Sequence, residues 1–121
     1  MSLSTSEEQL MQILWEKGRA YMKDLVDAYE EPKPALTTIA TLLKRLQEKN
    51  CVDYKQKGRS REYFPLVKKK EYFGKQMKGM IKNFFNNDAH QFASYFTETT
   101  DLNEEQLKEL RNLIDQQLQN K

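Results

Sequence analysis

The spacing of apolar residues changes between residues 35 and 66, and this change restricts the possible folds more than any other feature. In the first part the apolar side chains recur at intervals of three and four, as on one face of a helix: Leu36, Ile39, Leu42, Leu43 and Leu46. From Val52 to Leu66 the interval becomes two, around a turn at residues 57–60. A helix over residues 35–49 followed at once by a β-hairpin is therefore predicted, with Pro65 near the end or edge of the second strand.

Two shorter helices are expected before this segment. Ser4 and Glu7 have the spacing of a capping box, and Gly18 suits the left-handed residue that ends a helix. A second amphipathic helix is expected from about residue 23 to 31, because prolines at positions 32 and 34 prevent it from continuing. Three helices followed by a hairpin is the order of a winged helix-turn-helix, which we assign to residues 1–69.

The remaining residues, 70–121, carry three apolar stripes at helical spacing, with Asp88 and Asn103 as expected N-caps. The stripes comprise Phe73, Met77, Met80, Ile81 and Phe84, then Phe92 and Phe96, then Leu107, Leu110 and Ile114. Helices this short bury each other only partly within one small chain, and exposed apolar surface of this size usually marks a partner surface. The predicted fold is therefore mostly α with a small β-hairpin: a winged helix-turn-helix followed by a C-terminal helical dimerisation unit, in a homodimer.

Positive charge is concentrated in the middle of the chain. Residues 33–70 hold eleven lysines and arginines against three acids, a net charge of +8, whereas the whole chain has a net charge of +2. Such a field attracts a polyanion, and release of the counterions condensed on nucleic acid strengthens the binding. Double-stranded DNA is the expected partner of this segment.

Within a helix-turn-helix, the N-terminal half of the second helix of the motif enters the major groove. The exposed face of the helix predicted over residues 35–49 carries Thr37, Thr38, Thr41, Lys44 and Arg45, which we assign as DNA-binding. Threonine offers a hydroxyl and a methyl group, and arginine binds guanine through two hydrogen bonds. A solvated helix surface is the alternative, and for an isolated helix it is the stronger one. The proline turn before this helix and the basic hairpin after it favour DNA contact.

The hairpin also carries basic residues suited to phosphate contacts, which position a protein on DNA without reading its sequence. They are Lys55, Lys57, Arg59 and Arg61, and the alternative is a charged edge that blocks aggregation. At least one of Tyr54, Tyr63 and Phe64 is expected in the core, because the hairpin must pack on the helices. The aromatic pattern does not match an RNA-stacking surface.

Two other functions stay open. A winged helix also serves as a protein-interaction module, in which the basic face binds an acidic partner. A small-molecule-responsive regulator is a further alternative, with a pocket among Phe73, Met77, Phe84 and Phe92, although a stripe of this kind is more often plain core.

Catalysis has little support in the sequence. The single histidine, His90, has no partner at metal-ligand spacing, and Cys51 has no neighbouring base, so we expect no catalytic residue, metal site or cofactor. No apolar run reaches the ~18 residues that span a bilayer, and no signal peptide is recognisable. A cytoplasmic protein without a membrane partner is the expectation.

Three segments carry a family resemblance: residues 38–49 with the sequence TIATLLKRLQEK, the strand-end EYFPLV at residues 62–67, and the opening EQLMQILW at residues 8–15. Together with Asp101-Leu102 and the segment from Leu107 to Ile114, they resemble the penicillinase-repressor family of winged-helix transcriptional repressors, the BlaI, MecI and CopY type. The resemblance extends over essentially the whole chain.

The resemblance implies a homodimeric repressor that binds a pseudo-palindromic operator, with DNA contacts at the positions of Thr37, Thr38, Thr41 and Arg45. It also implies a regulatory protease, because antibiotic-responsive members are cleaved at an Asn-Phe bond in the penultimate helix. The matching bond here is Tyr95-Phe96, which keeps the phenylalanine but lacks the asparagine and so argues against proteolytic induction. Copper sensing is not expected, because the cysteine-rich tail of copper-responsive members has no counterpart here.

Overall fold

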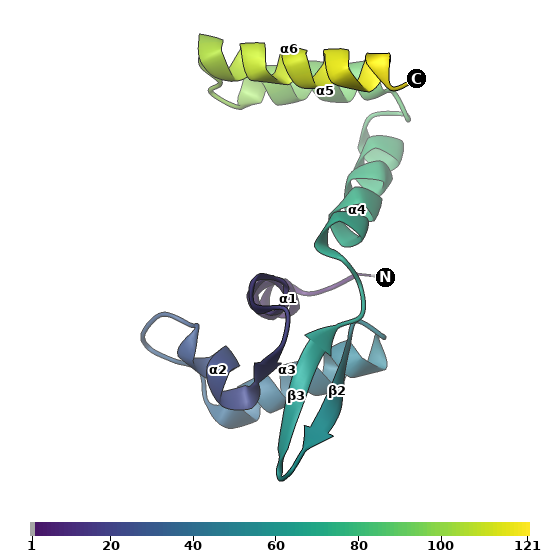
Figure 1. Cartoon of the computed structure of the whole chain (residues 1–121). Helices are drawn as coiled ribbons and strands as arrows, with labels where there is room; N and C mark the ends of the chain where they lie inside the picture. Colours follow the sequence, from purple (N-terminus) through teal and green to yellow (C-terminus); the bar gives the residue numbers. More distant parts are fainter. Residues whose placement is uncertain (1) are drawn as a thin grey trace. The chain divides into compact units, whose positions relative to one another are not determined.

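The computed structural model describes residues 2–121 (Figure 1). The chain divides into two compact units, one ending at Lys75 and the other running from Gln76 to Lys121. The first unit contains the predicted succession of three helices and a hairpin, and the second is helical. The prediction of a mostly helical chain with a small β element is therefore confirmed.

Three helices open the first unit: α1 (Thr5–Lys17), α2 (Met22–Asp27) and α3 (Leu36–Glu48). Both ends of α1 form as predicted. Ser4 Oγ accepts a hydrogen bond from the Glu7 amide at 3.1 Å, and Glu7 Oε1 accepts one from the Ser4 amide at 2.7 Å. Gly18 ends the helix with a φ of 77°, a conformation that favours glycine.

The second helix is shorter than the expected one over residues 23–31, because α2 ends at Asp27. Lys33 Nζ donates to the carbonyl oxygens of Asp27 and Tyr29 at 2.9 and 2.6 Å. Lys33, which stands between the two prolines, thus satisfies carbonyl groups at and just after the C-terminal end of α2, where a helix leaves such groups unpaired.

The sheet contains one strand more than the predicted hairpin. Strands β1 (Ala20–Tyr21), β2 (Val52–Lys57) and β3 (Ser60–Pro65) are antiparallel in the order β1-β3-β2. The hairpin turns at Gly58, whose φ is 62°, and Pro65 is the last residue of β3, as predicted. Because β1 has only two residues, no alternating pattern in the sequence could reveal it.

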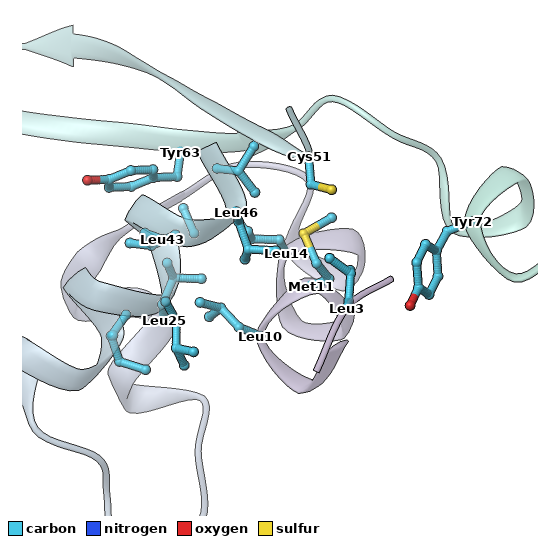
Figure 2. Close-up of a cluster of buried hydrophobic side chains, with 14 residues drawn as sticks. Leu3, Leu10, Met11, Leu14, Leu25, Leu43, Leu46, Cys51, Tyr63 and Tyr72 are labelled. Carbon is cyan, nitrogen blue, oxygen red and sulfur yellow. The ribbon is translucent and has the colours of Figure 1, made fainter. Parts of the chain in front are cut away.

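A single hydrophobic core holds the three helices and the sheet together (Figure 2). It contains Leu10, Met11 and Leu14 from α1, Leu25 from α2, Ile39, Leu43 and Leu46 from α3, and Val52 and Tyr63 from the sheet. Tyr63 is thus the core aromatic that the hairpin was expected to supply. Leu36, however, was predicted on the buried face and is 60% exposed. It is the first residue of α3, and the core begins one turn later, at Ile39.

The start of α4 (Lys69–Phe84) is fixed to α1 by aromatic side chains. Trp15 Nε1 donates to the Val67 carbonyl at 2.8 Å, and the Tyr72 hydroxyl donates to Glu8 Oε2 at 2.6 Å. Burial and the Glu8 carboxylate raise the pKa of Tyr72 to about 12. The Phe73 ring lies 5.8 Å from that of Trp15. The first turn of α4 therefore belongs to the winged-helix unit.

The second unit contains the rest of α4, then α5 (Ala89–Thr99) and α6 (Glu104–Gln119). Both predicted caps form: Asp88 Oδ1 accepts from the amides of His90 and Gln91, and Asn103 Oδ1 accepts from the Gln106 amide at 2.8 Å. Phe85 packs against α5, with its ring 5.5 Å from that of Phe92. None of the residues in α5 or α6 is fully buried within this chain.

Candidate nucleic-acid interface

Helix α3 has one buried and one exposed face, and the exposed face carries all five residues predicted to bind DNA on this helix. Ile39, Leu42, Leu43 and Leu46 are buried, whereas Thr37, Thr38, Thr41, Lys44 and Arg45 are exposed. The N-cap residue, Ala35, provides no side-chain hydrogen bond to the first turn. The Thr38 amide donates to the Ala35 carbonyl at 3.1 Å, so an anion such as a phosphate would meet the amides that precede it in that turn.

The hydroxyl of Thr41 is already engaged within the helix. Thr41 Oγ1 donates to the Thr37 carbonyl at 2.9 Å, so its hydrogen points along the helix and its lone pairs face outward. A threonine in this state retains the ability to accept a hydrogen bond from a base amino group and to pack its methyl group on a thymine methyl.

The cations of α3 are available to a ligand. Three ion pairs occur among residues 2–121, and neither Lys44 nor Arg45 takes part in any of them. Lys44 and Arg45 lie in the C-terminal part of α3, beyond the threonines. An exposed, unpaired arginine on a helix that can enter the major groove is suited to a guanine edge.

The hairpin distributes its four basic residues over two faces and a turn. Lys55 pairs in register with Glu62 and Lys57 with Ser60, so both lysines stand on one face of the sheet, whereas Arg61 pairs with Gln56 on the other. Arg59 lies in the exposed turn. The four basic residues were predicted as one set of phosphate contacts, but they lie on two different faces of the sheet and in the turn.

An ion pair between Lys49 and the buried carboxylate of Glu7 holds the end of α3, and no local sequence pattern predicted it. Lys49 Nζ lies 2.8 Å from Glu7 Oε1 and 3.2 Å from the Ser2 carbonyl oxygen. Burial raises the pKa of Glu7, but hydrogen bonds from Lys49 and Ser4, together with the lysine charge, lower it by more, so the net shift is downward. Lys49 follows α3 directly, so this pair ties the C-terminal end of α3 to the start of α1.

The residues predicted to form the dimer interface are mostly exposed in the single chain. Met77, Met80, Phe84, Phe96, Leu107 and Ile114 are exposed, and Ile81, Phe92 and Leu110 are half-buried. The exposed fraction reaches 79% for Phe84 and 59% for Ile114. Leu113 and Leu118 add to this surface on α6. Phe73 is also exposed, at 41%, but it belongs to the first unit, where its ring packs on Trp15.

Other predicted sites fall in different surroundings. Tyr95 and Phe96 lie inside α5, so the bond between them is helical and not in an extended loop. A shallow depression in the second unit is lined by Phe85, His90, Tyr95 and polar neighbours, and by none of the four residues proposed for a ligand pocket. Within residues 2–121, no helix has the length and apolar character needed to cross a bilayer, and no three potential metal ligands cluster.

The fold defines the class of this chain: a winged-helix protein in which the helix with the exposed polar face, α3, is followed by a basic hairpin. The family follows from comparison with known proteins. The model of the Penicillinase repressor family matches residues 3–116, so the chain belongs to this family. The family is one of DNA-binding regulators and not of enzymes.

Two sequence relatives and one solved structure illustrate the similarity. The methicillin resistance regulatory protein MecI of Staphylococcus aureus strain N315 is 27% identical over 93% of this chain and 92% of that protein. The penicillinase repressor of Bacillus licheniformis is 21% identical over 94% of this chain and 90% of that protein. The solution structure of monomeric Bacillus licheniformis BlaI with the blaP half-operator has a TM-score of 0.51 and 22% identity, covering 60% of this chain and 89% of that one.

Proposed function

We propose that the protein is a homodimeric transcriptional repressor that occupies a pseudo-palindromic operator through α3 and the hairpin. The observation that carries the proposal is the exposed face of α3, where three threonines stand beside two cations that take part in none of the ion pairs of residues 2–121. Two relatives are named as a regulator of methicillin resistance and as a penicillinase repressor, and BlaI was solved with a half-operator, which supports this reading.

The DNA contacts divide into two kinds. The N-terminal half of α3 enters the major groove, where Thr37, Thr38 and Thr41 meet bases and phosphates and Arg45 meets a guanine. Lys44 adds a phosphate contact. The hairpin cations bind the phosphate backbone beside the groove, which fixes the orientation of the module. One such module makes few phosphate contacts, so its affinity for DNA falls steeply as the salt concentration rises.

A second copy supplies the missing affinity. The apolar surface of the second unit, including Phe84, Leu107 and Ile114, packs against the same surface of another chain. Two modules then bind two half-sites together. Repression ends when the dimer separates, and the helical Tyr95-Phe96 bond, which lacks the asparagine of inducible members, gives a regulatory protease no clear target.

Substitution of Arg45 by alanine tests the proposed base contact. We expect a loss of about 1–3 kcal/mol in binding to the specific site, with little change on random DNA, because a bidentate contact to guanine reads sequence. The measurement is fluorescence anisotropy with labelled duplex from upstream of the protein's own gene, competed with random duplex at two salt concentrations.

The matched control for Arg45 is Lys57→Ala, which removes a cation from the hairpin. This control should weaken binding to both duplexes alike and flatten the salt dependence, because a phosphate contact carries no sequence information. If Arg45→Ala lowers the affinity for both duplexes equally, Arg45 contacts the DNA phosphate backbone and not a base. Wild-type protein that binds neither duplex would contradict the repressor function and favour an acidic protein as the partner of the basic face.

A further inference from the structure

We infer that Arg61 is a specificity-determining residue that selects a narrow, A·T-rich minor groove beside each half-site. The inference rests on the proposed function, and it separates Arg61 from the other hairpin cations, which bind phosphates without regard to sequence. Three features of the hairpin carry it: the face on which Arg61 stands, the ring that holds its guanidinium, and the distribution of acids.

The strand register places Arg61 on the face of the sheet that covers the helices. Directly paired residues of antiparallel strands project to the same face, and Arg61 pairs with Gln56, two positions from the Tyr54–Tyr63 pair. Tyr63 is 4% exposed and Val52, two residues before Tyr54, is also buried, so this face is the one packed on the core. Arg61 therefore extends from the core face at the end of the hairpin nearest its turn, beyond the buried residues.

An aromatic ring holds the Arg61 guanidinium in place. Its Cζ atom lies 4.3 Å from the centre of the Tyr54 ring. The Tyr54 ring is itself 5.6 Å from the ring of buried Tyr63, so the support for the arginine reaches the core. A guanidinium stacked on an aromatic ring loses less conformational freedom on binding than a free side chain.

The acids of the hairpin lie on the opposite face. Glu62 pairs in register with Lys55, and its Oε1 atom lies 3.8 Å from the Arg19 guanidinium, so Glu62 offsets positive charge on the face that carries the lysines. Asp53 belongs to the same face as Lys55, by the alternation of the strand. Among the ion pairs of residues 2–121, none involves Arg61. Arg61 thus keeps its full charge while the lysine face is partly neutralised.

A fixed, uncompensated arginine matches the chemistry of a narrow minor groove. A-tracts narrow this groove and strengthen its negative potential, and arginine enters such grooves readily. Arginine is favoured over lysine because a guanidinium is less strongly hydrated than an ammonium group, so it leaves water at lower cost. A lysine at position 61 would keep the charge and lose this preference.

The experiment starts with selection of DNA from a library of random duplexes by the full-length wild-type protein. The selected core sequence is then placed between A·T-rich and G·C-rich flanks, and both duplexes are titrated by fluorescence anisotropy. We expect wild-type protein to prefer the A·T flank by about five- to tenfold in Kd, and Arg61→Lys to reduce that ratio to about two or less. Arg61 is exposed and the change preserves its charge, so we expect the variant to fold, and circular dichroism checks this.

Two further variants sharpen the result. Tyr54→Leu keeps Arg61 and an apolar side chain but removes the ring, so it should also lower the flank ratio, provided that circular dichroism shows a folded protein. Lys57→Ala is the matched control, which should weaken binding to both duplexes equally and leave the ratio of the two Kd values unchanged.

The inference is overturned if wild-type protein has no flank preference, or if Arg61→Lys retains the preference. An equal loss on both duplexes for Arg61→Lys would also overturn it, because Arg61 would then be a phosphate contact. Failure of wild-type protein to select any core sequence is a different outcome, which would overturn the proposed repressor function itself.

Discussion

Replacement of Lys49 by methionine is expected to lower the free energy of unfolding by about 2–4 kcal/mol at neutral pH, because it leaves a buried carboxylate without its cation. Glu7 is 2% exposed, and its Oε1 atom receives Lys49 Nζ at 2.8 Å and the Ser4 amide at 2.7 Å. Its Oε2 atom is buried with no hydrogen-bond partner among the described residues. Lys49 itself has a side chain 37% exposed, which keeps the expected cost below that of a fully buried pair. Urea denaturation followed by circular dichroism gives the measurement.

The loss from Lys49→Met should shrink as the pH falls. In the wild-type protein the pKa of Glu7 is lowered on folding, so its contribution to stability is present above the unfolded pKa and is lost as the pH falls through the folded value. Without Lys49, two of the causes that lower the pKa of Glu7 are lost while burial still raises it, so this pKa is higher in the variant than in the wild-type protein. The variant then gains stability relative to wild type as Glu7 becomes protonated.

The double variant Glu7→Gln with Lys49→Met is the control, because it removes both charges and should recover part of the loss at neutral pH. Equal destabilisation of Lys49→Met at every pH between 4 and 7 would show that packing of the lysine stem, and not its charge, stabilises this site. A second consequence concerns DNA. Because the pair ties the end of α3 to α1, Lys49→Met should weaken DNA binding even where the protein remains folded.

Features that depend on neighbouring residues could be predicted from the sequence. The capping box of Ser4 and Glu7, the glycine that ends α1 and the caps at Asp88 and Asn103 all formed as expected, since each depends on a contact within a few residues. The exposed face of α3 was predictable for a similar reason, because helical periodicity alone separates it from the buried face.

Features that depend on distant parts of the chain could not be predicted. Strand β1 exists because Ala20 and Tyr21 pair with Tyr63 and Glu62, more than forty positions later in the sequence. Leu36 fits the apolar spacing of α3, but its exposure is set by where the tertiary core begins. The Glu7–Lys49 pair joins residues 42 positions apart. The stacking of Arg61 on Tyr54 depends on which residues of the two strands lie opposite each other, and the net charge of the segment does not reveal this register.

Glutamate placed at both Leu107 and Ile114 is expected to produce a monomer that binds an intact operator about 10²–10³ times more weakly than wild type. These residues are 44% and 59% exposed and belong to the apolar stripe of α6, so glutamate there costs little in the single chain. In the proposed dimer the same carboxylates would be buried against apolar side chains without partners, which opposes association. Analytical ultracentrifugation measures the state of association, and anisotropy on the selected operator measures binding.

Two comparisons separate loss of the dimer from loss of the fold. Asn112→Glu adds a carboxylate to α6 outside the apolar stripe, so that variant should remain dimeric and bind normally. A duplex with one half-site should bind the double variant and the wild-type protein with the same affinity per winged-helix unit, because α3 and the hairpin are unchanged. The large loss on the full operator arises only when two linked modules raise each other's effective concentration at adjacent half-sites. If the double variant stays dimeric, the dimer interface does not include the apolar stripe of α6. If the double variant is a monomer that still binds the operator tightly, operator binding does not require a dimer.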